Sequence, residues 1–269
     1  MKKKILKLTK GKEKRSTRKV AKLLESEGVK LSAESVRLAL RDNGLILHRQ
    51  VPRPKLTEDH QKRRLEFARK FLNHDWRHTL FTDEKHFTTF SPPNCRNNVI
   101  WDERGIEFVF KKVKHPPQIC FWGGISYFGK TALVEYEGTI NSKRYIDIIK
   151  NQQASIYSMF GRTPFWFQQD GATAHTLSAS QNFLCQTFAH FLEKGQWPAN
   201  SPDLNVIENL WSIINDRVWA CNPKGVNEMR TIILEEWNSL EPEILENLVD
   251  SMTHRLQECI DRNGTWTSY

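Results

Sequence analysis

The sequence lacks the features of several protein classes. None of its apolar runs reaches the roughly 20 residues that a membrane-spanning helix needs, and no secretory signal segment is visible, so we expect no membrane partner. Its five cysteines, at positions 95, 120, 185, 221 and 259, include no C-x-x-C pair. An odd and widely spaced set argues against a disulfide scaffold and against a zinc knuckle, and favours a reduced intracellular compartment. Internal repeats and low-complexity segments are absent as well.

Positive charge is concentrated at the start of the chain. Residues 1–70 hold 22 Lys or Arg and 8 Asp or Glu, whereas the other residues hold 18 and 23. The net charge of +9 therefore comes from a basic arm on a mildly acidic body. Such an arm favours a polyanionic partner such as nucleic acid, although a merely solubilising basic tail has the same composition. Its lysine-rich first 16 residues fit a disordered lead-in, a nuclear address or part of a first helix.

Two short helical patterns follow in this arm. One covers about 17–27 and stops at Gly28; the other covers about 33–42 behind the capping residue Ser32. Two helices joined by a tight turn predict a helix-turn-helix, whose second helix enters the major groove of DNA. Small helical hairpins that do not bind DNA share this pattern. The expected core residues are Val20, Ala21, Leu23, Leu24, Val36, Leu38, Ala39 and Leu40, and the candidate DNA contacts are Ser35, Arg37, Arg41, Arg49 and Arg53.

Three regions are predicted along the chain. Residues 1–47 form the basic helix-turn-helix module, and residues 48–77 form a linker and a connecting helix, because Pro52 and Pro54 prevent a continuous helix before Thr57. The Lys62-Arg63-Arg64 run on that helix fits a solvated face as well as a DNA contact. Residues 78–269 form the larger domain, which ends in helices.

Strands and helices alternate in the larger domain. Apolar runs predict strands over 78–83, 86–90, 118–127, 131–136 and 164–169 and near His190, with helices over about 142–159, from about 177, and across most of 204–261. Strands first, then strands alternating with helices, predict a mixed α/β layer fold behind a small all-α module.

Two acids stand at the ends of apolar strands. Asp83 ends the run Leu80-Phe81-Thr82, and Asp170 ends the run 165–169. Acids at strand ends in such a fold point into the crevice where ligands bind, although either one can instead cap the next element.

A third acid lies on a helix. Ser201 and Pro202 predict a helix start, and Asp203 in the first turn is explained by the helix dipole. Glu208 lies at the edge of the apolar stripe Leu204, Ile207, Trp211, Ile214 and Val218. An inward-facing carboxylate needs a partner, which is either a divalent cation or a Lys or Arg.

Together the three acids suit a hard cation. Mg²⁺ and Mn²⁺ prefer carboxylate oxygens and water, and two ions about 4 Å apart can activate a nucleophile and stabilise the leaving oxygen of a phosphodiester. Glu84, His86 and His175 are candidates for supporting roles next to the acids, although an ordinary structural role fits each histidine too.

The sequence around each acid is more specific than the acid itself. The blocks read FTDEKHF (residues 81–87), QQDGATAH (168–175) and WPANSPDLNVIENLW (197–211). In this order they resemble the three signature blocks of mariner-type DNA transposases, of the Tc/mariner superfamily. The resemblance covers about residues 17–260. The 37 residues between Asp170 and Glu208 resemble a less common branch with a longer spacer and Glu as the third acid.

The resemblance implies a fold, a site and a set of partners. It implies an RNase H-like catalytic core, with Asp83, Asp170 and Glu208 as catalytic residues and ligands of Mg²⁺ or Mn²⁺, two ions being expected. It also implies cut-and-paste transposition in the nucleus: a homodimer pairs two transposon ends, hydrolyses phosphodiesters at the inverted repeats of double-stranded DNA, and joins the 3′-hydroxyl to a TA target.

The chain departs from the family pattern at three points. Gly171 stands where many relatives have Asn, and Val206 where many have Pro; neither change removes a metal ligand. Relatives usually carry two helix-turn-helix units, and only one is visible here, so we expect the first unit to be missing.

Two other functions remain open from the sequence. A non-catalytic DNA-binding protein derived from a transposase would need only the basic arm and would bind DNA without metal. A structure-specific nuclease would use the three acids but would leave the helix-turn-helix unexplained.

Overall fold

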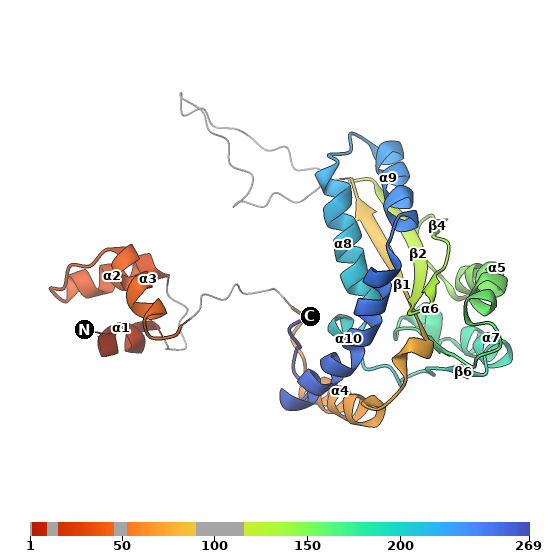
Figure 1. Ribbon diagram of the computed structural model, residues 1–269, viewed down its shortest axis with the longest axis horizontal. Coiled ribbons are helices and arrows are strands. Elements are labelled where there is room, and N and C mark those ends of the chain that lie inside the picture. Colours follow the sequence, from red (N-terminus) through yellow and green to blue (C-terminus); the bar gives the residue numbers. More distant parts are fainter. Residues whose placement is uncertain (1, 10–15, 46–52, 90–115) are drawn as a thin grey trace. The chain divides into compact units, whose positions relative to one another are not determined.

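The chain divides into two compact units, Met1–Pro54 and Lys55–Tyr269. The computed structural model describes residues 2–9, 16–45, 53–89 and 116–269 (Figure 1). Within these ranges, no helix combines the length and the apolar character needed to cross a membrane.

The described part of the first unit is helical. Helices α1 (Lys2–Thr9), α2 (Thr17–Ser26) and α3 (Ala33–Arg41) follow one another. The side chain of Ser16 accepts a hydrogen bond from Lys19 N at the start of α2, and Ser32 accepts one from Ser35 N at the start of α3. Both caps satisfy backbone N–H groups that the first turn of a helix leaves free. The predicted pair of helices is therefore confirmed.

A small apolar core holds these three helices together. It consists of Ile5, Val20, Leu24 and Val36. Because Ile5 belongs to this core, the lysine-rich start of the chain includes a first helix, which is one of the three alternatives left open by the sequence. Leu38, expected in the core, is 49% exposed, because it lies about half a turn of α3 away from the buried Val36.

The second unit begins with α4 (Glu58–Phe71), whose start is fixed by a capping box. Thr57 accepts a hydrogen bond from His60 N, and the His60 side chain accepts one from Thr57 N. Helix α4 packs against α10 (Pro242–Asp261). Arg64, for which a solvated face or a DNA contact was expected, is instead fully buried, because its guanidinium forms an ion pair inside the unit.

Among the described residues, a six-stranded mixed sheet forms the centre of the second unit. Its strands are β1 (Thr79–Thr88), β2 (Gln118–Ser126), β3 (Gly129–Lys130), β4 (Val134–Tyr136), β5 (Trp166–Gln168) and β6 (His190–Phe191). Their order is β3-β2-β1-β5-β6, with β4 also paired to β2. Strand β1 is antiparallel to β2 and parallel to β5, and β6 is parallel to β5.

Two details of the strand prediction are wrong. The two strands expected over 78–83 and 86–90 are one strand, because β1 pairs with β2 without a break from Phe81 to Thr88. The polar side chains of Asp83, Glu84 and Lys85 do not interrupt this pairing, since it is formed by the backbone. Of the strand expected over 131–136, only Val134–Tyr136 (β4) is a strand; β3 (Gly129–Lys130) precedes that range, and both pair with β2.

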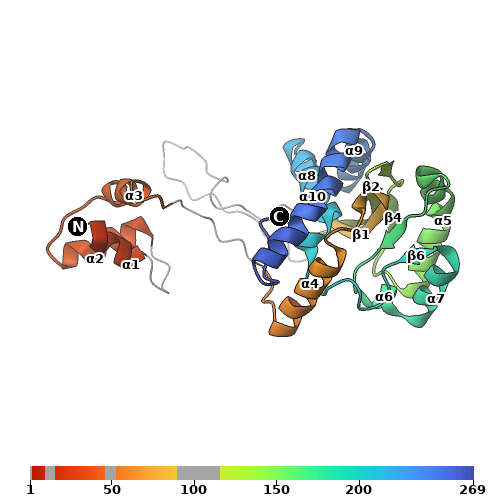
Figure 2. The ribbon, with the colours of Figure 1, turned by 60° about the horizontal axis from the view of Figure 1, so that its bottom comes forward.

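Helices cover both faces of the sheet (Figure 2). Helices α5 (Ser142–Phe160) and α7 (Ser178–Thr187) lie on one side, over a core that includes Leu80 and Trp122. Helices α8 (Val206–Ala220), α9 (Val226–Asn238) and α10 lie on the other side, over a core that includes Phe81 and Phe121. Neighbouring residues of one strand thus enter different cores, as the pleat requires.

The predicted helix start at Ser201 is wrong in its details. Residues Pro202–Leu204 form a single 3-10 turn, and α8 begins only after Asn205. The Ser201 hydroxyl donates to Ala199 O and makes no cap bond. Asp203 is buried and accepts two hydrogen bonds from Arg64, so this ion pair, and not the dipole of a helix, explains its presence. The expected apolar stripe of α8 is buried, as predicted.

The segment 264–269 packs back onto the same loop. Thr267 donates from its backbone N and from Oγ1 to Asp203 Oδ2, at 2.9 and 3.0 Å. Gly264 has a φ of +78°, and a Cβ at this position would lie 2.0 Å from Gln61 O of α4. Only glycine fits so close to the backbone of α4.

Candidate active site

Asp83 and Asp170 are brought together by two parallel neighbouring strands. In the register of β1 and β5, Phe81 pairs with Gln168. Asp83 and Asp170 each lie two residues beyond that pair, so both carboxylates lie next to the carboxyl end of β5. The predicted strand-end placement is confirmed for Asp170, which follows β5, but is wrong for Asp83, which lies within β1.

Glu208 comes to the same place, beside Asp83 and Asp170, from α8. It lies in the first turn of that helix, which packs on β1. One turn further along, Trp211 donates its indole Nε1–H to Asp83 Oδ2 at 3.2 Å. Helix and strand are thereby connected at the site itself.

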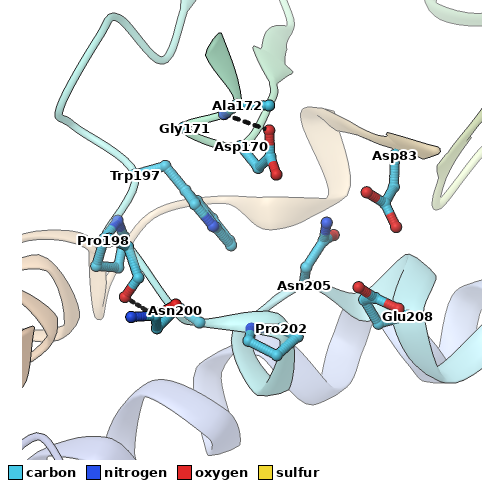
Figure 3. Close-up of a pocket in the computed structure, with 12 residues that line it drawn as sticks. Asp83, Asp170, Gly171, Ala172, Trp197, Pro198, Asn200, Pro202, Asn205 and Glu208 are labelled. Atoms are coloured by element: carbon cyan, nitrogen blue, oxygen red, sulfur yellow. Dashed lines mark hydrogen bonds between the residues drawn. The ribbon is translucent and has the colours of Figure 1, made fainter. Parts of the chain in front are cut away.

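The three acids line one open cavity of about 410 Å³ (Figure 3). A loop of residues 197–202 forms another part of its wall. The remaining lining residues are Gly171, Ala172 and Asn205. Glu208 lies across the cavity from Asp170, with Asp83 facing both.

The His175 ring lies between Asp170 and Glu84 and contacts both. Its Nδ1 is 2.7 Å from Asp170 Oδ1, and its Nε2 is 3.1 Å from Glu84 Oε1. The same Asp170 Oδ1 accepts a hydrogen bond from Ala172 N at 2.9 Å. The His175 ring is buried and packs on the ring of Tyr145, with centroids 4.2 Å apart. Two donors therefore fix Oδ1, which leaves Oδ2 of Asp170 for the cavity.

These hydrogen bonds place a positive charge beside two acids. Burial by itself lowers the pKa of His175, but the hydrogen bonds and charges of Asp170 and Glu84 raise that pKa to about 10. Burial by itself raises the pKa of Asp170, but His175 and the Ala172 N–H hold the pKa below its ordinary value. The imidazole is thus charged at neutral pH, and Asp170 is ionised.

The other two acids of the cavity are in an unfavourable electrostatic environment. Burial raises the pKa of Asp83 well above its ordinary value, and the negative charges of Glu208 and the neighbouring acids raise it further. Burial also raises the pKa of Glu208, against the opposing charge of Lys85. The cavity thus gathers more negative charge than its own residues neutralise.

Of the three residues suggested for supporting roles, Glu84 and His175 belong to the hydrogen-bonded group around Asp170 described above, whereas His86 does not. His86 is exposed and turned elsewhere: its Nδ1 lies 3.2 Å from Cys120 Sγ, and its Nε2 lies 3.4 Å from the hydroxyl of Tyr136. It contacts none of the three acids.

Two residues of the site were not singled out from the sequence. Trp211 was predicted only as core, although its i, i+3 spacing from Glu208 was a signal that both lie on one face of α8. Asn205 was seen only as part of the third block. Its burial in the cavity wall depends on the turn before α8, which the sequence did not predict.

A ready-made metal cluster is not present among the described residues: no three His, Cys, Asp or Glu side chains are arranged so that they could hold an ion by themselves. The three carboxylates instead surround an open space. Mg²⁺ is commonly bound in this way, through one or two carboxylates together with waters and substrate phosphates. The arrangement suits binding of a cation together with a phosphodiester.

The candidate DNA contacts lie in the first unit. Ser35, Arg37 and Arg41 are exposed on α3, and Arg37 forms a hydrogen-bonded pair with Glu34 at 2.6 Å. Arg53 is half-buried after the helices, and Arg49 lies outside the described residues.

Known proteins resemble this chain in sequence and in structure. Residues 78–229 match the family described as DDE superfamily endonuclease, and residues 2–73 match a helix-turn-helix family described as Transposase. The chain is 31% identical over 243 residues to the transposable element Tc3 transposase of Caenorhabditis elegans, which covers 88% of this chain and 72% of that protein.

Solved structures that share its fold include two at 16% sequence identity. One is a Mos1 transposase paired-end complex with left transposon end, with a TM-score of 0.78 over 99% of this chain and 79% of that one. The other is a Mos1 mariner paired end complex with Mn, with a TM-score of 0.76 over 100% and 80%. The second unit accordingly has an RNase H-like fold, a mixed sheet flanked by helices.

Proposed function

Since the chain belongs to the mariner/Tc1-type DDE transposases, we propose that it carries out cut-and-paste DNA transposition. It hydrolyses phosphodiesters at transposon ends and then transfers the freed 3′-hydroxyl into target DNA. The observation that carries this proposal is the convergence of Asp83, Asp170 and Glu208 on one open cavity.

The residues of this cavity fit a divalent cation. Carboxylate oxygens are the ligands that Mg²⁺ and Mn²⁺ prefer. Burial first and the neighbouring acids second raise the pKa of Asp83, and a bound cation would offset both effects by favouring the ionised carboxylate. Asp83, Asp170 and Glu208 would hold two such ions. When bound, the ions would activate water or the 3′-hydroxyl and stabilise the leaving oxygen of the phosphodiester.

The chain's own residues prepare the site for this reaction. His175 and Ala172 N–H fix one oxygen of Asp170, so the carboxylate presents the other to the cavity. Trp211 holds one oxygen of Asp83. The opening between them leaves space for a DNA backbone. Because these groups are held before substrate arrives, little reorganisation is needed at the moment of reaction.

The first unit would supply DNA recognition. Helix α3 carries Ser35, Arg37 and Arg41 on its exposed side, and Arg49 and Arg53 follow it in the chain. We propose that α3 enters the major groove of the inverted repeat. The proposal also includes a homodimer that pairs two transposon ends, a TA target and action in the nucleus. The Mos1 transposase, which shares the fold, forms a paired-end complex.

Cleavage of end-containing DNA tests this function. With Mg²⁺ or Mn²⁺, the wild-type chain is expected to nick such DNA, and Asp170→Asn is expected to abolish nicking. Asp216→Asn, the same change at an exposed position of α8, is the control and should leave nicking intact.

Two results would contradict the proposal. Equal nicking by wild type and Asp170→Asn would show that the assigned site is wrong. Metal-independent, salt-sensitive DNA binding without any cleavage would instead indicate a non-catalytic DNA-binding protein derived from a transposase.

A further inference from the structure

Asn205 occupies a helix start without acting as a cap. It is the residue directly before α8. An asparagine at this position ordinarily accepts a hydrogen bond through its side chain from a backbone N–H of the first turn. In this structure the Asn205 side chain makes no such bond. Its amide therefore has another role.

The side-chain oxygen of Asn205 has no partner within the described chain. The residue is 3% exposed, and its Oδ1 is buried without a hydrogen-bond donor. Buried polar atoms of native proteins nearly always have a partner, and one without a partner marks a missing water, ion or ligand. The partner of Oδ1 is therefore a group from outside the residues that the structure describes.

The surroundings of Asn205 indicate which kind of group this is. The side chain lines the cavity and rises into the space between Asp83, Asp170 and Glu208 (Figure 3). Ionised carboxylates are acceptors and cannot donate to Oδ1, and the indole N–H of Trp211 is used by Asp83. A buried amide oxygen without a donor, in the wall of a cavity that three carboxylates also line, is suited to bind a cation.

The chemistry of an amide oxygen fits the same ion as the three acids. Hard divalent cations accept the carbonyl oxygen of Asn as a ligand beside carboxylates. A neutral oxygen also adds a ligand without adding charge. This matters because three carboxylates already line the same cavity.

We propose that Oδ1 of Asn205 is a fourth side-chain ligand of the divalent cation site formed by Asp83, Asp170 and Glu208. This inference rests on the cation site of the proposed function and adds a ligand to it. The amide turns away from the helix end, and the ion replaces the backbone N–H as its partner.

Binding of Mn²⁺ to the full chain, without DNA, tests the assignment. Free Mn²⁺ is followed by electron paramagnetic resonance, and thermal unfolding is measured with and without the ion. Asn205→Ala is expected to weaken Mn²⁺ binding by about tenfold or more, which is the scale on which changes around a metal site act. Asn205→Asp keeps an oxygen and should bind Mn²⁺ at least as well as wild type. Without metal, Asn205→Ala should unfold at the wild-type temperature or above, because no hydrogen bond is lost.

Asn200→Gly is the matched control. Asn200 lines the same cavity, but its amide Nδ2 contacts His60, and glycine tolerates its φ of +53°. This variant should bind Mn²⁺ like the wild type.

Three outcomes would overturn the inference. In the first, Asn205→Ala binds Mn²⁺ as tightly as wild type. In the second, it unfolds earlier without metal but keeps the full Mn²⁺-induced rise, which indicates a structural role. In the third, it loses only DNA affinity, which indicates that the amide donates to a phosphate. Asp170→Asn separates the two proposals. If Asp170→Asn and Asn205→Ala both leave Mn²⁺ binding unchanged, the cation site of the proposed function fails. If Asp170→Asn weakens Mn²⁺ binding and Asn205→Ala does not, only the role of Asn205 fails.

Discussion

Arg64 and Asp203, 139 residues apart in the sequence, form a fully buried ion pair with two hydrogen bonds. Arg64 Nη1 lies 2.8 Å from Asp203 Oδ1, and Nη2 lies 2.7 Å from Oδ2. Arg64 Nε also donates to Gly264 O, and Thr267 donates to Asp203. The pair thus joins α4, the loop in front of α8 and the segment 264–269 directly beside the candidate active site.

Replacement of Arg64 should destabilise the second unit strongly. Arg64→Met leaves the carboxylate of Asp203 buried and unpaired, which is expected to lower the free energy of unfolding by about 3–5 kcal/mol. Arg63→Met is the matched control, because Arg63 is exposed and pairs with Asp59 on the surface of α4. Its effect should stay within about 1 kcal/mol. Denaturant unfolding measures both, and equal effects would contradict the importance of the buried pair.

The same pair should make the fold sensitive to acid. Burial by itself raises the pKa of Asp203, but Arg64 and Thr267 hold that pKa below its ordinary value of 3.8. Because the group titrates lower in the folded chain, its stabilising contribution is present above pH 3.8 and is lost as the pH falls below that value. Unfolding of an Arg64→Met/Asp203→Leu double variant should depend less on acid than unfolding of the wild type. Identical pH dependence would refute this assignment.

Gly264 should tolerate no side chain. In Gly264→Ala the new Cβ would meet Gln61 O at 2.0 Å, so the segment 264–269 must shift and release Thr267 from Asp203. We expect a loss above about 3 kcal/mol, since a clash and a strained φ act together. Gly195→Ala is the control: Gly195 has a similar φ of +81°, but its Cβ would meet nothing within 4 Å. In the control, backbone strain alone should lower the free energy of unfolding, by about 1–2 kcal/mol. Thermal or denaturant unfolding measures both variants.

Removal of one catalytic candidate should stabilise the metal-free protein. Asp83→Asn removes a charge that burial and the neighbouring acids disfavour, while its amide oxygen can still accept from Trp211. The unfolding temperature without metal at neutral pH should rise by roughly 2–4 °C for each kcal/mol gained. With saturating Mn²⁺ the order should reverse. A lower unfolding temperature without metal would show that the acids do not repel one another as inferred.

DNA binding by the first unit should depend on α3. If Arg41 contacts a phosphate, Arg41→Ala is expected to weaken binding to all DNA sequences. It should also reduce the slope of the logarithm of the binding constant against the logarithm of the salt concentration by about one. If Arg41 instead reads a base, the loss of about 1–3 kcal/mol should fall on the specific site alone. Fluorescence anisotropy across a salt series distinguishes the two. The exposed Lys224→Ala, on the second unit, is the control and should change neither quantity.

The sequence predicted those parts of the site that local pattern determines. Asp83 and Asp170 could be placed because each follows an apolar run in the sequence, and Glu208 because it lies on a stripe with helical spacing. The α/β order could be predicted for the same reason, since period and turn residues are local properties. The continuous strand β1 was missed because its acidic stretch looks like a break, whereas its pairing with β2 depends only on the backbone.

Contacts between distant residues could not be predicted. Asp203 looked like part of a helix start because nothing near it in the sequence indicates Arg64. Likewise, the role of His175 depends on Glu84 in β1 and Asp170 in the loop after β5, which lie 91 and 5 residues away in the sequence. One local clue was available for Asn205, since asparagine is a good capping residue, but it pointed to the role that the structure excludes.

The attachment of Thr267 to Asp203 has a consequence during protein synthesis. The loop in front of α8 is held by a residue that is translated 64 positions later. A ribosome that has made all three acids has not yet made the segment that holds this loop. Chains that end after Glu208 but before Thr267 are therefore expected to bear the three acids without an ordered loop beside them.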